Sequence, residues 1–283
     1  MNRVPFGRRQ ISTADVIYNG VGIAVLVVMG FPVYWMVATA FKRGRDILSL
    51  VPVWFPIAPS LANFQDAIGR PYFVSSVATS IEVVATTVVA SLALAFLASV
   101  AVARFLFRGR RLFLFLVIVV QMIPLNALVI PIYLQFNAAG LTDQLPPLVL
   151  VYMAYVLPFM VWTLRGFVAT VPVDLEEAAM IDGCSRIGAF VRILLPLVAP
   201  GLVATSIYAF IQAWNEYITA YILLSSPEHQ TLTVWLAGFT TNHGPAWGPL
   251  MAGATLTSIP VVIFFMIVQR QVITGLTAGG VKG

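Results

Sequence analysis

Charged residues and cysteine are both scarce in this chain. Of its 283 residues, 10% are charged and 60% are hydrophobic, whereas a soluble domain usually carries about 25% charged and about 45–50% apolar residues. This shortage of charge argues against a soluble enzyme and against a disordered protein. The single cysteine, Cys184, excludes an internal disulfide and a metal site built from a cysteine cluster.

Several motifs of catalysis and binding are also missing. The sequence has no G-x-x-x-x-G-K-S/T phosphate loop, and neither His229 nor His243 lies in an H-E-x-x-H or H-x-x-E-H zinc motif. A net charge of +5 would suit nucleic acid, but the arginines lie between apolar blocks, which is the usual topology signal of a membrane protein. We therefore expect no metal, no nucleic acid and no enzymatic site of its own in this chain.

What the chain does contain is six long apolar blocks. A helix needs about 20 mainly apolar residues to cross the hydrocarbon core of a bilayer. The alternation of a β-barrel is absent, so the backbone groups must be satisfied within helices. Residues 38–40 resemble a signal-peptidase site, but the apolar run before them is too long, so we predict a retained span. The six predicted spans are residues 16–40, 74–103, 112–136, 145–164, 197–224 and 250–268.

The distribution of Lys and Arg sets the predicted orientation. Cytoplasmic segments of membrane proteins carry an excess of both residues. With the N-terminus inside, the outer segments contain Lys42, Arg43, Arg45 and Arg70, and every other Lys and Arg lies in an inner segment. The sequence therefore predicts an all-α integral membrane protein with six transmembrane helices and with both the N- and C-termini in the cytoplasm.

The most informative segment is the long inner loop 165–196. Asp174 is positioned to cap a short helix, with Glu177 three residues later completing a capping box. Gly183 can end that helix in the left-handed conformation, and a second short helix is expected to follow. Two short helices with a small-residue face suit docking into a groove on a partner protein. An interfacial helix that merely links two spans is the alternative.

This loop resembles the EAA loop of permease subunits from ATP-binding-cassette (ABC) importers. The matching residues are Glu177, Ala178 and Ala179, then Gly183, and finally Pro196 at the entry to the fifth span. Two further segments resemble the carbohydrate branch of this family, of the maltose (MalG-like) type. They are residues 213–216 in the fifth span, with the sequence Ala-Trp-Asn-Glu, and the glycine-rich C-terminal residues 275–283.

The resemblance implies the type I ABC importer permease fold, the bacterial cytoplasmic (inner) membrane and a division of labour. A second permease subunit would complete a heterodimer, two ATPase subunits would hold ATP and Mg, and an extracytoplasmic sugar-binding protein would deliver the sugar substrate. This chain itself would bind no cofactor. The residues implied to contact the ATPase subunits are Asp174, Glu177, Ala178, Ala179, Gly183 and Pro196 in the loop, and Gly275, Gly279, Gly280 and Lys282 in the tail.

Polar side chains inside the predicted spans are the candidates for the translocation pathway. Ionisable residues are costly in a bilayer and are functional candidates by default. Amides, carboxylates and aromatic rings are also the groups that suit a sugar. Helix–helix hydrogen bonding is the commoner use of such residues and stays open as the alternative. The candidates are Glu82 in the second span, Gln121 and Asn126 in the third, and Trp214, Asn215, Glu216 and Tyr217 in the fifth.

The predicted organisation has four segments. They are a cytoplasmic N-terminal segment (1–15), the first transmembrane helix with an outer loop (16–73), a five-helix permease core (74–270) that contains the coupling loop 165–196, and a cytoplasmic tail (271–283). The predicted function is the transmembrane permease subunit of an ATP-driven importer for a sugar or oligosaccharide, forming half of the translocation pathway. The alternatives are a stand-alone secondary transporter, which would want internal repeats, and a membrane-embedded enzyme.

Overall fold

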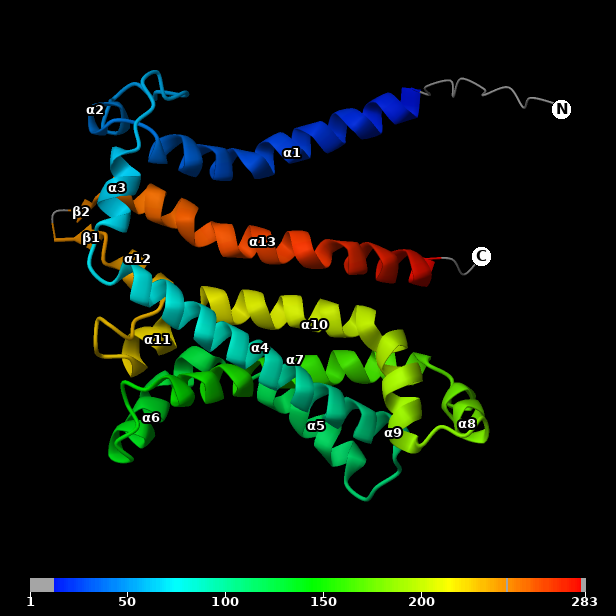
Figure 1. Ribbon diagram of the computed structural model, residues 1–283. Coiled ribbons are helices and arrows are strands. Elements are labelled where there is room, and N and C mark those ends of the chain that lie inside the picture. Colours follow the sequence, from blue (N-terminus) through cyan, green and yellow to red (C-terminus); the bar gives the residue numbers. More distant parts are fainter. Residues whose placement is uncertain (1–12, 243, 281–283) are drawn as a thin grey trace. The chain divides into compact units, whose positions relative to one another are not determined.

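A computed structural model describes residues 13–242 and 244–280 of the chain. Its contacts divide the chain into two compact units. The first unit runs to Gly69 and includes Thr241–Leu256, and the second comprises Arg70–Thr240 and the residues from Thr257 onward. Helices make up most of both units (Figure 1).

The first unit begins with the long helix α1 (Thr13–Ala40). From Val16 to Tyr34 its side chains are exposed on every side, and an apolar helix without a polar face suits a lipid environment. The loop after it holds only two short helices, α2 (Gly44–Ile47) and α3 (Ala62–Ile68).

Asn63 on α3 holds this loop against the end of α1. Its side-chain amide donates to the carbonyl of Ala40 at 2.9 Å and to that of Lys42 at 2.7 Å. A short hairpin of β1 (Thr240–Thr241) and β2 (Gly244–Pro245) precedes the last helix, α13 (Trp247–Gly280).

The second unit is centred on the packing of α4 (Phe73–Arg104) against α7 (Leu145–Thr170). The helix α10 (Leu195–Asn215) packs against both. Small residues on the buried face of α4 allow close helix packing. They are Ser76, Thr79, Ser80, Thr87, Ser91, Ala95 and Ser99. The apolar core lies between α4, α7 and the start of α10, where Met160, Leu164, Leu194 and Val198 are fully buried.

Within the described residues, five helices are long and apolar enough to cross a membrane. They are Val16–Ala40, Phe73–Arg104, Leu145–Thr170, Arg186–Asn215 and Trp247–Gln269. These correspond to five of the six predicted spans.

The predicted third span, residues 112–136, is not one helix. It is a pair, α5 (Arg110–Gln121) and α6 (Leu125–Ala138), bent by 96° (Figure 1). The break has a local cause at Pro124, because the residue before a proline is forced out of the helical conformation. The expectation of a continuous helix here was wrong, and the pair is a broken span or a re-entrant loop.

The predicted fifth span, residues 197–224, starts earlier and ends earlier than expected. Its helix begins with α9 (Arg186–Ala189) and reaches α10 through one π-helical turn, Phe190–Leu194. Pro196 explains that turn, since its ring conflicts with the carbonyl four residues earlier and it has no N–H to donate. The helix stops at Asn215 and resumes as α11 (Ile218–Leu223), so the expectation of an unbroken helix to residue 224 was wrong.

The C-terminal helix also ends later than the sequence suggested. A separate tail was expected from residue 271, but α13 continues to Gly280. The backbone of Gly275, Gly279 and Gly280 is therefore helical, and Lys282 lies outside the described residues.

Candidate functional site

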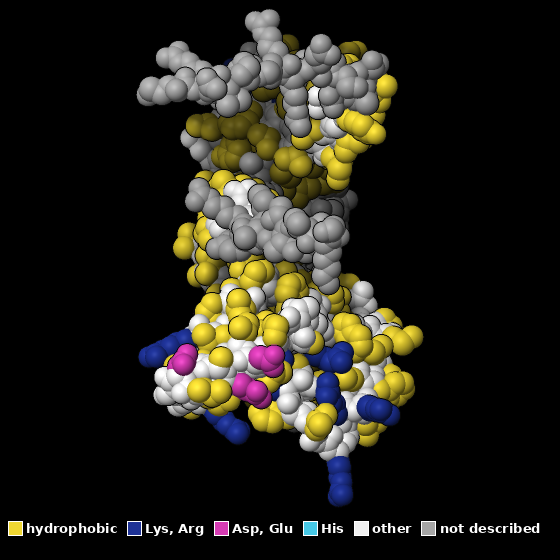
Figure 2. Space-filling view, turned by 90° about the vertical axis from the view of Figure 1, so that its right-hand side faces the viewer, with side chains coloured by type: hydrophobic (Ala, Val, Ile, Leu, Met, Phe, Trp, Pro, Cys, Tyr) yellow, Lys and Arg dark blue, Asp and Glu magenta, His cyan; other side chains and the backbone are white. Residues whose placement is uncertain are grey.

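Charged side chains gather on the end of the second unit that carries α8 (Val173–Ile181), as Figure 2 shows. Charges are costly in hydrocarbon, so this end of the unit belongs outside the membrane core. The exposed basic residues between α4 and the first turn of α5, and in the segment after α8, are Arg108, Arg111, Arg186 and Arg192. The exposed acidic residues on and just after α8 are Asp174, Glu177 and Asp182, and Glu176 on the same helix is half-buried.

The start of α8 differs from the predicted capping box. Pro172 occupies the N-cap position and no side chain caps the helix, so the expectations for Asp174 as N-cap and for its box with Glu177 were wrong. The fixed backbone of Pro172 starts the helix two residues earlier than expected and places Asp174 in the first turn. There Asp174 and Glu176 lie near the positive end of the helix dipole.

An ion pair anchors this helix to the end of α4. Arg104 donates from Nε and Nη2 to Oε1 of Glu176 at 2.8 and 2.7 Å. Its Nη2 also donates to the carbonyl of Val171 at 3.0 Å. The two side chains are only 11% and 18% exposed. Sequence reasoning missed this contact, because nothing local links residues 72 positions apart.

The end of α8 has the predicted left-handed glycine. Gly183 has φ +94°, its N–H donates to the carbonyl of Met180, and the N–H of Cys184 donates to that of Ala179. This pair of hydrogen bonds is the Schellman motif, which satisfies the last carbonyls of a helix. Gly183 thus sets the direction in which the chain leaves α8 for α9, where the Oγ of Ser185 accepts from the N–H of Gly188.

The outward face of α8 and α9 has no cover within the described chain. Glu177 and Ala178 are exposed and Ala179 is half-buried. Two isoleucines, Ile181 and Ile187, are 86% and 76% exposed. Apolar side chains exposed beside charged ones mark an interaction surface. We call residues 173–188 the α8–α9 surface.

A second candidate site is an open pocket of about 600 Å³, where the two helix breaks face each other. Discontinuous helices are a recurrent way for a membrane protein to build a polar site at depth. The pocket is lined by Gln121, Met122, Ile123, Pro124, Leu125, Asn126, Tyr155, Gln212, Asn215, Glu216, Tyr217 and Ile218.

Five of the seven predicted pathway residues line this pocket: Gln121, Asn126, Asn215, Glu216 and Tyr217. The other two do not. Trp214 is buried with its ring stacked on that of Phe210, and Glu82 is exposed on α4.

Two polar residues of the pocket, Tyr155 and Gln212, were not predicted from the sequence. Gln212 donates from Nε2 to the hydroxyls of Tyr155 at 3.0 Å and Tyr208 at 3.3 Å. Gln212 lies three residues before Asn215, and residues three apart lie on the same face of a helix. This spacing could have predicted that Gln212 lines the same pocket as Asn215.

Glu216 organises the second break. Its carboxylate accepts from the hydroxyl of Tyr152 on α7 at 2.8 Å, and from the N–H groups of Thr219 at 2.8 Å and Ala220 at 3.1 Å. Its carbonyl accepts from the hydroxyl of Thr233 at 2.9 Å, next to the start of α12 (Leu232–Ala237). The side chain therefore supplies the acceptors that let α11 begin, and it ties that helix to α7.

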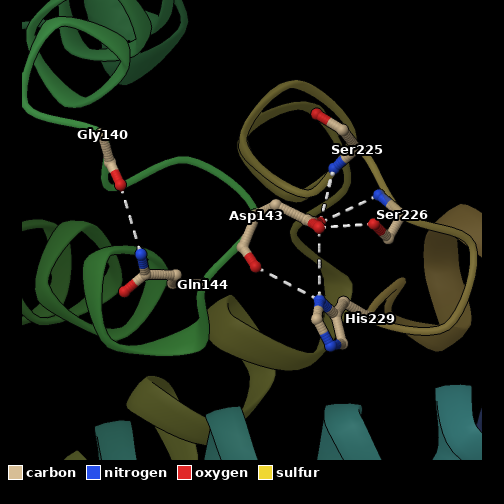
Figure 3. A network of polar contacts seen from close by, with 6 residues as sticks. All are labelled: Gly140, Asp143, Gln144, Ser225, Ser226 and His229. Carbon is tan, nitrogen blue, oxygen red and sulfur yellow. Dashed lines mark hydrogen bonds and ion pairs between the residues drawn. The ribbon is translucent and has the colours of Figure 1, made fainter.

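A polar network just before the start of α7 joins two loops (Figure 3). The carboxylate of Asp143 accepts from the N–H groups of Ser225 at 3.0 Å and Ser226 at 2.9 Å, and from the Ser226 hydroxyl. Nδ1 of His229 lies 3.5 Å from the same carboxylate. The N–H of Asp143 donates to the carbonyl of Leu223 at 2.8 Å. Asp143 thus links the end of α6 to the end of α11.

The pKa of Asp143 lies below its ordinary value. Partial burial raises this pKa, but the hydrogen bonds from Ser226, the nearby His229 and the N–H of Ser225 together lower it by more. A depressed carboxyl pKa stabilises the folded state at pH values above the ordinary pKa, and this contribution is lost as the pH falls through the depressed value.

We expect Asp143→Asn to lower the apparent melting temperature by a few degrees at pH 7, because the charge-assisted hydrogen bonds weaken. The difference from wild type should shrink once the pH falls below the ordinary aspartate pKa of 3.8. Melting curves at pH 7, 5 and 3 measure it, with Asp66→Asn, an exposed carboxylate in the first unit, as control. The same difference at pH 3 as at pH 7 would contradict the assignment.

The chain is similar to known membrane components of transport systems over most of its length. Residues 91–277 match the family model of the binding-protein-dependent transport system inner membrane component. The diacetylchitobiose uptake system permease protein DasC of Streptomyces coelicolor is 46% identical over 94% of this chain and 96% of its own length. The sulfoquinovosyl glycerol transport system permease protein SmoH of Agrobacterium fabrum is 34% identical over 93% of each chain.

A solved structure shares the fold. The chain is similar, with a TM-score of 0.77 and 22% identity, to a chain of a bacterial ABC transporter involved in the import of the acidic polysaccharide alginate. The match covers 94% of this chain and 99% of that one.

Proposed function

This chain belongs to the family of binding-protein-dependent transport system inner membrane components, and we propose that it is the permease subunit of an ATP-driven importer for a sugar or oligosaccharide. The observation that carries the proposal is the full-length similarity to a permease of a disaccharide uptake system. The chain is a multi-pass membrane protein, and its several long apolar helices fit a location in the membrane. It forms one half of the translocation pathway, and a second permease subunit forms the other.

The α8–α9 surface is the part that we assign to coupling. A pair of ATPase subunits holds ATP and Mg and contacts Glu177, Ala178, Ala179 and the exposed isoleucines, while this chain binds no cofactor. The Schellman turn at Gly183 and the ion pair between Arg104 and Glu176 fix the surface to the helices, so that a movement of the partner is passed on to α4 and α10. Pro196 contributes through the π-turn that joins this surface to α10.

We also assign contacts with the ATPase pair to four C-terminal residues: Gly275, Gly279, Gly280 and Lys282. An extracytoplasmic binding protein delivers the sugar on the other side. The experiment that tests the whole assignment is co-purification: the tagged chain, expressed with its neighbouring genes, should bring down an ATPase subunit whose hydrolysis rises when binding protein and sugar are added. A chain that purifies alone from such cells would overturn it.

The finer topology is also a proposal. The broken pair α5–α6 counts as one crossing, which gives six crossings of the bacterial cytoplasmic membrane with both termini inside. The positions of Lys and Arg support this orientation.

Cysteine labelling should give opposite results on the two faces. In a Cys184→Ser background, an impermeant thiol reagent added to intact spheroplasts should label Asn242→Cys, which is exposed in the hairpin, and should leave Ile187→Cys unlabelled until the membrane is opened. Each variant serves as the control of the other. Labelling of Ile187→Cys alone would reverse the topology.

Substitutions of two neighbouring pocket residues should distinguish an effect on assembly from an effect on transport. Glu216→Ala leaves three donors without an acceptor. We therefore expect the free energy of unfolding to fall by about 3 kcal/mol and little complex to assemble. Within the described residues, the side chain of Asn215 donates to the carbonyl of Ile211 on its own helix, at 2.8 Å, and to no other group. Asn215→Ala should therefore assemble normally and lower the transport rate. Equal amounts of complex in both variants would show that Glu216 does not hold the break together.

A further inference from the structure

The pocket between the two helix breaks has one charged side chain in its wall. Among the residues that line it, Glu216 is acidic and none is Lys, Arg or His. The other polar groups are neutral: the amides of Gln121, Asn126, Gln212 and Asn215 and the hydroxyls of Tyr155 and Tyr217. The pocket is therefore rich in uncharged donors and acceptors and lacks positive charge.

No cation neutralises the Glu216 carboxylate within residues 16–242 and 244–269, because none of the ion pairs there includes it. Its three partners are a tyrosine hydroxyl and two backbone N–H groups, which are neutral donors. These hydrogen bonds fix the position of the negative charge and leave its field directed into the pocket. Low-dielectric surroundings make such a field stronger than in water.

Two of the amides are free to meet a ligand. In the described part of the chain, the side chains of Gln121 and Asn126 are exposed to the pocket and have no hydrogen-bond partner. An amide offers both donors and acceptors, as a sugar hydroxyl requires. The ring of Tyr217, stacked on Tyr221 at 5.5 Å, adds an aromatic surface at the rim.

We infer that this pocket admits neutral saccharides and excludes anionic ones such as uronic acids. The inference rests on the proposed function and adds the charge class of its substrate. A carboxylate or sulfonate is recognised by guanidinium or ammonium groups, which the part of the wall formed by this chain does not provide. An anionic sugar would lose its hydration and meet Glu216 without compensation. A neutral sugar exchanges water hydrogen bonds for amide hydrogen bonds.

The field of the pocket can be measured with charged thiol reagents on the complete complex in a Cys184→Ser background. Asn126→Cys places the probe in the pocket, and Asn137→Cys places a matched probe on the exposed end of the same helix. The ratio of the rate with a cationic methanethiosulfonate to that with an anionic one should be about tenfold higher at position 126. Equal ratios at both positions, or no reaction at position 126, would overturn the inference.

A second measurement uses sugars directly. Alkylation of Asn126→Cys by neutral N-ethylmaleimide should be slowed by a neutral disaccharide at high concentration and unaffected by a uronic-acid disaccharide at the same concentration. Equal protection by the two sugars would overturn the charge selection, and protection by neither would remove the pocket as a sugar site. Both outcomes differ from a failure of the proposed function, which appears as the absence of an ATPase partner in co-purification.

Discussion

Replacing Glu176 with glutamine should destabilise α8 by about 2–3 kcal/mol, because it leaves the largely buried Arg104 guanidinium without a negative charge to compensate it. Hydrogen exchange of the α8 amides should then rise by roughly 30-fold or more. Transport and the stimulation of ATP hydrolysis should fall together, since α8 loses its anchor on α4. Hydrogen–deuterium exchange with peptide resolution and an ATPase assay on the same preparation measure both effects.

The adjacent residue supplies the matched control. Glu177 is exposed and forms no ion pair within the described residues, so Glu177→Gln makes the same chemical change without removing an intramolecular contact. We expect it to leave exchange in α8 unchanged and to weaken only the response to the ATPase partner. If both variants exchange like wild type, the ion pair between Arg104 and Glu176 does not hold the helix.

Gly183→Val should impair coupling strongly although it removes no contact. An added Cβ at Gly183 would meet nothing within 4 Å, so the cost comes only from its φ of +94°. A left-handed conformation costs a residue with a side chain about 1–2 kcal/mol, and more when it is β-branched. The stimulated ATPase activity should fall by about 5- to 30-fold, the population change that such a cost produces.

Gly183→Asn is the control for this position, because asparagine tolerates the left-handed conformation better than other residues with a side chain. It should retain most of the activity, and both variants should be present in the membrane at the wild-type level. Activity that is equally low in the two variants would point to a lost partner contact at Gly183 instead of a strained turn.

The sequence was a good guide wherever the controlling signal was local. Long apolar runs identified five long helices of the described chain, and Gly183 identified the end of α8, because a glycine after a helix has few other uses. The Pro124 break was open to the same reasoning, since the residue before a proline leaves the helix. The expected capping box failed because Pro172 competes with Asp174 for the same position.

What the sequence could not reveal are contacts between distant segments. Glu216 looked like one more intramembrane carboxylate until its bonds to Tyr152, Thr219 and Ala220 showed that it starts α11. The link between Asp143 and Ser226 joins residues 83 positions apart. Pairings of this kind depend on the packing of α7 against its neighbours, which hydropathy does not encode. The two helix breaks share one pocket for the same reason.

We propose that this chain moves a sugar only as part of an ATP-driven complex, and uptake into proteoliposomes is the direct test. The complete complex is reconstituted with binding protein outside and ATP inside, and uptake of a labelled neutral disaccharide is compared with and without ATP and with an imposed proton or sodium gradient. We expect uptake that requires both ATP and the binding protein. Uptake by the chain alone, driven by an ion gradient without ATPase subunits, would contradict it.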